Sequence, residues 1–533
     1  MGGGGLTPWL GLLACCLSAA CQQSHGPCET SSQCLSGEVC VDKICRKRCR
    51  DDGACFFGER CRLGTCLPAL TPCSDSRQCR SYERCYDQSC HQLCVDAIGC
   101  RSDEQCVDGI CLARPQPRLA AGHGHSCAVL AGPLVKCWGD NKYGQLGVGD
   151  LSNRGDQPGE LGGSLPAVDL GGDFLPVAVT AGRSFSCALS AAGAVKCWGE
   201  NGDGQLGLGD IDNRGVTRQQ LGTALRAVDL GALPPVTAIA AGQSHVCALI
   251  DGGTVKCWGA NSKGQLGLGD TVDRGVGPNQ LGAFLPSVDL GARCLVVAIA
   301  ANEQRSCAIC VEGAIKCWGG NGCGELGLGD LEDRGDGPDE MGHRLPAIDL
   351  GDGRRAVALA MGAFHTCAVV DDGTVRCWGA NGQGQLGLGD AVARGGEEGT
   401  MGDRLPAVAL GGAPAVALSG GESHSCALLD RVGVKCWGNN GNGQLGQGDV
   451  IDRGNEVNPE LGDSLQPVDV GGLQGIATIG TGWYHNCLQR VDGSIKCWGY
   501  NADGQLGIGD TLNRGEQPGQ MGESLPAVNL GSL

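Results

Sequence analysis

Large aromatic side chains and positive charge are both scarce in this sequence. Only 20 of the 533 residues are Trp, Tyr or Phe, so a core of this size cannot depend on aromatic packing. Lys and Arg number 40 against 58 Asp and Glu, which leaves a formal net charge of −18. Because proteins that bind nucleic acid need a positive surface against the phosphates, this charge argues against a nucleic-acid partner.

Long apolar runs and the motifs of known enzymes are also missing. Beyond the N-terminal region, no stretch approaches the roughly 18 continuous apolar residues that a membrane helix needs. The chain has no nucleophile elbow around a Ser, no H-E-x-x-H and no P-loop. We therefore expect no catalysis, no cofactor and no bound metal, and contact with a membrane only through an N-terminal lipid.

Glycine and cysteine are abundant instead, with 95 and 36 residues. The glycines follow no G-X-Y period, which excludes collagen, and a hydrophobic content of 41% is enough for a packed interior. A reducing cytosol rarely keeps so many thiols in regular pairs, whereas an oxidising compartment joins them as disulfides. The cysteine count therefore predicts an extracytoplasmic protein.

The N-terminus supports export. Residues 6–14 form an apolar run, and the sequence Leu-Ser-Ala-Ala places small residues directly before Cys21. This arrangement resembles a bacterial lipoprotein signal, in which the cysteine becomes the lipidated first residue, although no Lys or Arg precedes the run. We expect a signal over 1–20, lipidation of Cys21 and a tether over 21–27. Lipidation of Cys15 and an ordinary cleaved secretory signal are the alternatives.

Residues 28–111 contain 16 cysteines in four quartets, each spaced C-x5-C-x5-C-x4-C and grouped as two pairs, 28–66 and 73–111. So short a segment leaves almost no room for a core, which favours two disulfides in each quartet. Zinc is the alternative, but zinc sites typically use C-x2-C spacing. Three connectivities stay open for each quartet. The pattern resembles the small disulfide modules of secreted proteins, including the Dickkopf N-terminal region, which serve as spacers or protein-contact domains.

From residue 118 to residue 533 the chain repeats a unit of about 60 residues seven times. Each copy carries Cys-Trp-Gly-x-Asn-x-x-Gly-Gln-Leu-Gly-x-Gly-Asp, with Glu325 as the one replacement for Gln. A period of this length is typical of propellers, solenoids or arrays. The marker tryptophans are Trp138, Trp198, Trp258, Trp318, Trp378, Trp437 and Trp498.

Within a copy, short apolar segments alternate with Gly, Pro and Asp turns and show no helical period. In the third copy the segments cover 236–242, 246–250, 254–258 and 284–290, which predicts four strands, as in a propeller blade. The first segment of each copy is rich in Ala and Gly. Because small side chains suit crowded strands, we expect this segment to lie nearest a central channel.

Each copy also contains two cysteines that are ten positions apart. Antiparallel pairing through the turn at Gly252 places Cys247 opposite Cys257, close enough for a disulfide. We therefore expect one cross-strand disulfide per blade, with buried free thiols as the alternative. The expected pairs are Cys127/Cys137, Cys187/Cys197, Cys247/Cys257, Cys307/Cys317, Cys367/Cys377, Cys426/Cys436 and Cys487/Cys497.

The repeated motif, G-x-x-H-x-C-A-L followed by G-x-V-K-C-W-G-x-N-x-x-G-Q-L-G-x-G-D, resembles the regulator-of-chromosome-condensation (RCC1) repeat, and more closely its bacterial extracellular type with an added Cys pair. The resemblance covers about 415 residues. Seven copies then imply an all-β fold, a seven-bladed β-propeller, preceded here by the disulfide-rich modules. How the ring closes stays open.

Most copies carry a His two residues before the first cysteine of the pair, and the residues just before this position vary most. They lie on one class of loop, hence on one face of the disc. Exposed aromatic residues on such loops are typical contact residues. Two candidates, Phe185 and Arg305, replace a His that the other copies carry two residues before the cysteine. The candidate ligand contacts are Trp483, Tyr484, Phe364, Phe185 and Arg305, with local packing as the alternative.

Four further patterns have structural interpretations. An Asp and an Arg four residues apart recur in all copies, and a salt bridge suits them better than a calcium site, because the Arg stands where a ligand is needed. The recurring His is expected to be a hydrogen-bonded structural residue and not a metal ligand. Two Arg-Gly-Asp tripeptides, beginning at Arg154 and Arg334, match an integrin-type recognition motif. Because the third residue differs in the other five copies, ordinary variation between repeats explains them better than recognition. The fourth copy adds Cys294, Cys310 and Cys323, so one thiol is left free or bonded elsewhere.

These features predict an exported protein of the cell envelope, lipid-anchored or secreted, that is not an enzyme. A rigid disc would present its variable loops to a protein or glycan partner at the cell surface. Guanine-nucleotide exchange, an activity that the resemblance implies, is one alternative, although the signal and the cysteines speak against a cytosolic GTPase as partner. A polysaccharide-active propeller enzyme is the other.

Overall fold

A computed structural model describes residues 118–130, 132–472 and 475–531, together with the backbone of eight short strands between residues 38 and 113. None of the helices in this described part is long and apolar enough to cross a bilayer.

The chain divides into two compact units, residues 1–93 and residues 94–533. The boundary falls inside the second predicted pair of cysteine quartets, 73–111. The expected signal, the tether and the lipidation site at Cys21 lie outside the described residues and stay predictions.

Each cysteine quartet contains one two-stranded antiparallel sheet, in whose register the third and fourth cysteines are paired, for example Cys40 with Cys45. The disulfides expected within the quartets lie outside the described side chains. The strands are β1 (Glu38–Val41) with β2 (Ile44–Lys47), β3 (Glu59–Arg62) with β4 (Thr65–Pro68), β5 (Glu83–Tyr86) with β6 (Ser89–Gln92), and β7 (Glu104–Val107) with β8 (Ile110–Ala113).

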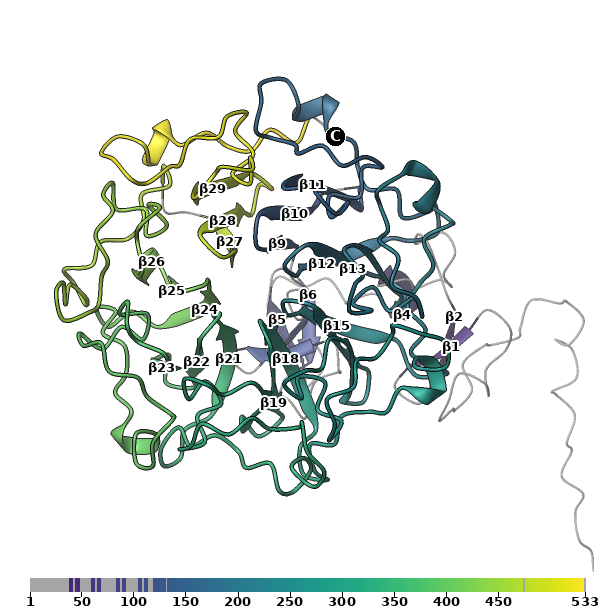
Figure 1. Ribbon diagram of the computed structural model, residues 1–533, viewed down its shortest axis with the longest axis horizontal. Coiled ribbons are helices and arrows are strands. Elements are labelled where there is room, and N and C mark those ends of the chain that lie inside the picture. Colours follow the sequence, from purple (N-terminus) through teal and green to yellow (C-terminus); the bar gives the residue numbers. More distant parts are fainter. Residues whose placement is uncertain are drawn as a thin grey trace, which may run out of the picture. The chain divides into compact units, whose positions relative to one another are not determined.

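From residue 118 the described chain forms seven three-stranded antiparallel sheets around a central channel, which confirms the predicted seven-bladed propeller (Figure 1). The inner strands are β9 (Leu119–Ala121), β12 (Pro176–Ala181), β15 (Val236–Ala241), β18 (Val296–Asn302), β21 (Ala356–Met361), β24 (Ala415–Gly420) and β27 (Ile476–Thr481). The middle strands are β10 (His125–Leu130), β13 (Phe185–Ser190), β16 (His245–Ile250), β19 (Arg305–Cys310), β22 (His365–Val370), β25 (His424–Leu429) and β28 (His485–Arg490). The outer strands are β11 (Leu134–Gly139), β14 (Val195–Gly199), β17 (Thr254–Gly259), β20 (Ile315–Gly319), β23 (Val375–Gly379), β26 (Gly433–Gly438) and β29 (Ile495–Gly499).

The prediction of a fourth strand per blade was wrong. In the third blade the segment 284–290 makes one backbone hydrogen bond with the outer strand, from Val288 N to Val255 O at 2.8 Å. In the blade before it, the equivalent segment ends at Leu230, whose carbonyl accepts a hydrogen bond from Lys256 Nζ at 2.9 Å. The segment therefore joins one blade to the next through a side chain and forms no fourth strand. In the seventh blade its contact with the outer strand is a single antiparallel bridge, between Lys496 and Ala527. The loops also contain short 3-10 helices, η5 (Gly162–Ser164), η6 (Arg218–Gln220), η7 (Gly282–Phe284), η8 (Gly402–Arg404) and η9 (Gly522–Ser524).

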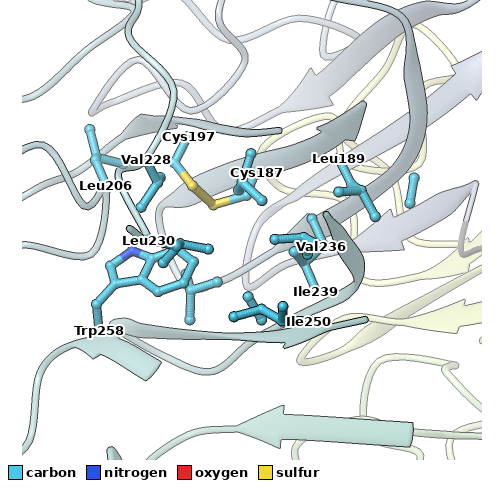
Figure 2. Close-up of a cluster of buried hydrophobic side chains, with 14 of the residues drawn as sticks. Cys187, Leu189, Cys197, Leu206, Val228, Leu230, Val236, Ile239, Ile250 and Trp258 are labelled. Atoms are coloured by element: carbon cyan, nitrogen blue, oxygen red, sulfur yellow. A yellow bond between two sulfur atoms is a disulfide. The ribbon is translucent and has the colours of Figure 1, made fainter. Parts of the chain in front are cut away.

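A hydrophobic cluster lies between each pair of neighbouring blades. Between the second and third blades, the Cys187–Cys197 disulfide and Leu206 pack with the indole of Trp258 (Figure 2). All seven marker tryptophans are fully buried, each in a cluster that contains the disulfide cysteines of the preceding blade. One Trp per blade thus builds a core in a chain that has few aromatic residues.

The ring closes by the same contacts that join its other blades. Trp258 donates its indole N–H to Gln205 O, in the loop of the preceding blade, at 3.1 Å. Trp138 of the first blade donates in the same way to Gln505 O of the last blade at 2.9 Å. In the described part of the chain, the first and last blades keep separate sheets, so no strand is shared between them.

The structure confirms the predicted disulfide in every blade. Cys247 and Cys257 occupy paired positions, with their Cα atoms 4.1 Å apart. In the fourth copy Cys294 bonds to Cys310, while Cys323 is free. The other blade disulfides are Cys127–Cys137, Cys187–Cys197, Cys307–Cys317, Cys367–Cys377, Cys426–Cys436 and Cys487–Cys497.

Alkylation of the unreduced protein is expected to label one cysteine of the described propeller, Cys323. Burial and the nearby Glu325 carboxylate raise the pKa of this thiol, so labelling should be slow at neutral pH and faster at alkaline pH. Peptide mapping by mass spectrometry measures the label. Label on any blade disulfide pair, or its absence from Cys323 at alkaline pH, would contradict the assignment.

Candidate functional site

The turns between the inner and middle strands lie at one end of the channel and form its mouth. In each turn, the residue two positions before the middle strand belongs to what we call the mouth ring. Neighbouring turns are joined by backbone hydrogen bonds, such as Gln243 N to Glu303 O at 2.9 Å. The turns and inner strands line a cavity of about 260 Å³. The mouth ring consists of His123, Arg183, Gln243, Glu303, Ala363, Glu422 and Trp483.

A second ring surrounds the mouth ring. The residue that follows each outer strand donates its backbone N–H to the mouth turn of the same blade, as Tyr500 does to Tyr484 O at 2.9 Å. The seven mouth-ring positions hold six different residue types, so the repeats diverge where they face the channel opening. The second ring consists of Asp140, Glu200, Ala260, Gly320, Ala380, Asn439 and Tyr500.

A hydrogen bond connects two blades across the mouth. Trp483 Nε1 donates to Glu303 Oε1 at 2.9 Å, although 180 positions separate the two residues. Their turns follow β27 and β18, which lie on opposite sides of the channel (Figure 1). Glu303 has a φ of 44°, in the left-handed region, which costs a non-glycine residue about 1 kcal/mol or more. The turn of the fourth blade therefore holds a strained conformation that places this carboxylate over the mouth.

Aromatic rings gather beside this bond. The ring centroids of His123 and Trp483 are 3.8 Å apart, those of Trp483 and Tyr484 are 5.9 Å apart, and those of Tyr484 and Tyr500 are 6.2 Å apart. We call these four residues the aromatic cluster. Trp483, Tyr484 and Tyr500 are each partly exposed, so the cluster offers aromatic surface to a ligand.

Burial sets the charge state of this site. Burial raises the pKa of Glu303, while the Trp483 hydrogen bond and the Arg305 and Arg183 charges oppose the rise. Burial also lowers the pKa of His123, with Arg183 adding to the effect, so His123 is neutral at pH 7. Among the described residues, neither Glu303 nor Glu422 has a Lys, Arg or His nitrogen within 4.0 Å. The two carboxylates are thus without a close ion-pair partner.

Two of the five predicted ligand contacts, Phe185 and Arg305, have buried side chains that do not reach the surface of the mouth. Phe185 is 0% exposed and packs with Val246 of the next blade. Arg305 is 2% exposed and donates to Gly362 O and Ala363 O, each at 2.6 Å. Both residues occupy the position of the recurring His, where the next blade covers the side chain.

The other three candidates lie on the mouth face. Phe364 is 42% exposed, and Trp483 and Tyr484 are partly exposed. A role in binding remains a prediction for these three. Sequence reasoning did not select Glu303, Glu422, Tyr500 or His123, although the replacement of Gly by Asn302 in the fourth turn was a visible signal.

The recurring His is a buried, hydrogen-bonded residue, as predicted. Its Nε2 meets a side chain of the next blade, for example His245 with Ser306 Oγ at 2.8 Å. No group of three potential metal ligands occurs in the part of the chain that the structure describes. The other pairs are His125 with Ser186, His365 with Ser425, His424 with Asn486, and His485 with Ser126.

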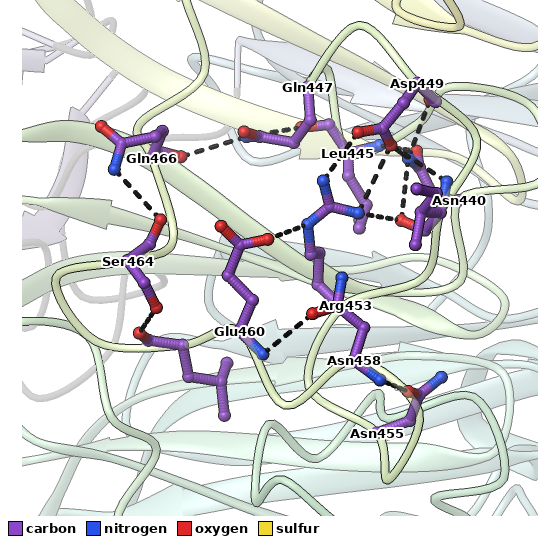
Figure 3. Close-up of polar contacts among 12 residues, drawn as sticks. Asn440, Leu445, Gln447, Asp449, Arg453, Asn455, Asn458, Glu460, Ser464 and Gln466 are labelled. Atoms are coloured by element: carbon purple, nitrogen blue, oxygen red, sulfur yellow. Dashed lines mark hydrogen bonds and ion pairs between the residues drawn. The ribbon is translucent and has the colours of Figure 1, made fainter.

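The recurring Asp and Arg form salt bridges in all seven blades, again as predicted. Arg453 and Asp449 lie 2.7 Å apart, and Asn440 donates to Asp449 O, so the pair fixes the loop after the outer strand (Figure 3). Glu460 adds a second carboxylate to Arg453 in this blade. The other pairs are Asp150/Arg154, Asp210/Arg214, Asp270/Arg274, Asp330/Arg334, Asp390/Arg394 and Asp510/Arg514.

Trp483 is the one described tryptophan that solvent reaches, because the seven markers are fully buried. In a chain that lacks residues 1–20, and therefore Trp9, we expect acrylamide to quench a minor part of the Trp emission. W483F should remove that part and leave the emission of the buried markers. Equal quenching of both proteins would contradict the partial exposure of Trp483.

Comparison with known proteins agrees with this architecture. The chain matches the RCC1-like domain over residues 88–449. It is 32% identical to the ultraviolet-B receptor UVR8 of Arabidopsis thaliana over 397 residues, which cover 74% of this chain and 79% of the receptor. It is 30% identical to human E3 ubiquitin-protein ligase HERC2 over 334 residues, which cover 62% of this chain but 6% of the ligase.

A solved structure shows the same fold. In the crystal structure of Kap60 bound to yeast RCC1 (Prp20), the match has a TM-score of 0.54 at 18% identity and covers 85% of this chain and 87% of that chain. The described propeller has seven blades, each with a disulfide, and the family match covers more than half of the sequence. This chain belongs to the RCC1-like domain family.

Proposed function

We propose that this protein is an exported, non-catalytic binding protein that presents the mouth of its propeller to a protein or glycan partner at the cell surface or in the envelope. The observation that carries the proposal is the site formed by Glu303, Trp483 and the aromatic cluster. In the fourth and seventh blades this site differs from the repeated sequence, and the differing residues, Glu303 and Trp483, are hydrogen-bonded across the channel. Strained residues of this kind persist where the surrounding structure holds them, often at ligand sites.

The disulfides support export. Each described blade contains a fully buried cystine that would need an oxidising compartment to form. Attachment to a membrane through a lipid on Cys21 is part of the proposal and rests on the sequence alone. A protein of the same fold, yeast RCC1 (Prp20), is seen bound to another protein, Kap60, which supports a binding role.

Site-specific photo-crosslinking in intact cells tests the proposal. Benzoylphenylalanine replaces Tyr500, at the mouth, or Glu312, which is exposed in the turn between β19 and β20 at the other end of the channel. We expect a discrete crosslinked partner from position 500 and none from position 312. Identical products from both positions, or a product from position 312 alone, would overturn the assignment. Recovery of cytosolic GTPases alone would instead favour nucleotide exchange.

A further inference from the structure

Negative charge is concentrated around the channel mouth. The mouth ring contains two carboxylates, Glu303 and Glu422, against one permanent cation, Arg183, and the second ring adds Asp140 and Glu200 without a cation. The recurring Asp–Arg salt bridges of the described propeller lie in the loops that follow the outer strands. The Arg305 and Lys142 charges also act on Glu303 and Glu200, so four carboxylates face three cations here. The mouth therefore keeps a small excess of negative charge beside an aromatic surface.

The geometry of Trp483 limits what this surface can bind. Its indole N–H is already donated to Glu303, so the residue offers a ring and no free donor. The edge-on contact of His123 at 3.8 Å covers part of that ring. An aromatic face beside unpaired carboxylates suits a cation, which gains from both the ring quadrupole and the charge. A sugar ring would instead need an open flat face, which His123 partly covers here.

The channel wall adds acceptors for a cation. In the described sheets each inner strand pairs only with its middle strand, so its other edge faces the channel. Side chains of neighbouring blades already bind some of the backbone groups at this edge, because Asn302 Nδ2 donates to Met361 O and Thr481 N donates to Ser419 Oγ. The cavity of about 260 Å³ behind the mouth has room for one long side chain. Small residues such as Ala120 and Gly480 keep the wall open.

We propose that the channel mouth binds the cationic side chain, Arg or Lys, of an extended basic segment in a partner protein. The cation lies between the ring of Trp483 and the carboxylates of Glu303 and Glu422. This inference rests on the proposed function and specifies its ligand. The charge of the mouth complements such a segment and repels an acidic one.

A labelled peptide tests this. A fluorescein-labelled nonapeptide of Gly and Ser with a central Arg-Gly-Arg is compared with the same peptide carrying citrulline, the neutral isostere, at both Arg positions. Fluorescence anisotropy with the full chain is expected to show binding of the Arg peptide, weakened about tenfold or more by citrulline. The double variant E303Q/E422Q should weaken it similarly, while the amide oxygen that it introduces at position 303 still accepts the Trp483 N–H.

A matched variant separates specific from general attraction. E312Q/D371N removes the same charge from exposed turns at the other end of the channel and should leave binding within about twofold. Equal weakening by both double variants, or equal binding of the citrulline peptide, would overturn the proposal. Binding of maltohexaose in place of the Arg peptide would reject the ligand class but keep the mouth as the site. If benzoylphenylalanine at position 500 captures no partner, the proposed function itself is rejected.

Discussion

Lowering the pH from 7 to 5 is expected to remove about 10 kcal/mol of the propeller's free energy of unfolding. Burial lowers the pKa of His125, His365 and His485 to about 3 and that of His245 and His424 to about 4. In the unfolded chain these pKa values return to about 6.5. Below pH 6.5 the unfolded state therefore binds protons that the native state does not, and each His costs about 1.4 kcal/mol per pH unit.

The sign of this effect sets the pH window. The contribution of the five histidines is fully present above pH 6.5. It is lost as the pH falls towards about 4 for His245 and His424 and towards about 3 for the other three. Since a domain typically has a net stability of about 5–15 kcal/mol, mild acid should be enough to unfold the propeller. Urea unfolding followed by circular dichroism between pH 5 and pH 8 measures the slope.

The chain offers its own control for the acid effect. Phe185 and Val246 occupy the positions that His245 and Ser306 occupy one blade later, and they form an apolar pair. The double variant H245F/S306V copies that pair and should lower the pH slope by one proton, about 1.4 kcal/mol per pH unit. A slope unchanged by this variant, or a stability independent of pH between 5 and 8, would contradict the account.

Reduction of the disulfides is the second change with a large expected effect. Each blade cystine joins positions ten residues apart, and the loop-closure entropy of such a loop is worth about 3 kcal/mol. The sum over seven blades exceeds the net stability of an ordinary domain, so we expect the fully reduced propeller not to refold. The comparison is refolding from guanidinium with and without a phosphine reductant, followed by tryptophan emission.

Removal of one disulfide at a time measures how much each blade disulfide contributes to stability. C247A/C257A should lower the free energy of unfolding by about 2–5 kcal/mol, because the cystine also packs beside Trp318 in the next blade. C323S, which removes a cysteine that is free, should leave stability within about 0.5 kcal/mol. Recovery of native tryptophan emission by the reduced wild-type chain would show that the blade disulfides are not needed for folding.

Features that are local or repeated were predictable from the sequence. The turn at Gly252 set the register that pairs Cys247 with Cys257, and repetition of Trp every 60 residues or so identified the blades. The fourth strand was mispredicted, because an apolar segment with a suitable turn looks the same whether it pairs within its blade or packs on the next one. The tertiary contacts distinguish the two cases, such as the hydrogen bond from Lys256 to Leu230 O of the preceding blade.

The functional site depends on ring closure, which no local pattern shows. Glu303 and Trp483 meet because seven blades bring the fourth and seventh turns to opposite sides of one channel. The burial of Phe185 likewise depends on the next blade, where Val246 stands in place of the usual hydroxyl or amide residue. Such paired changes between neighbouring blades can be found in the sequence by comparing each copy with the next one, position by position.

Hydrogen exchange of the protein alone and bound to the partner captured at position 500 tests the central claim most directly. Amides that are shielded by a ligand exchange more slowly. If the mouth is the binding site, exchange slows in the turns at 302–305 and 482–485 and is unchanged in the turns at 251–253 and 311–313, at the other end of the channel. Slower exchange confined to 251–253 and 311–313 would contradict the account.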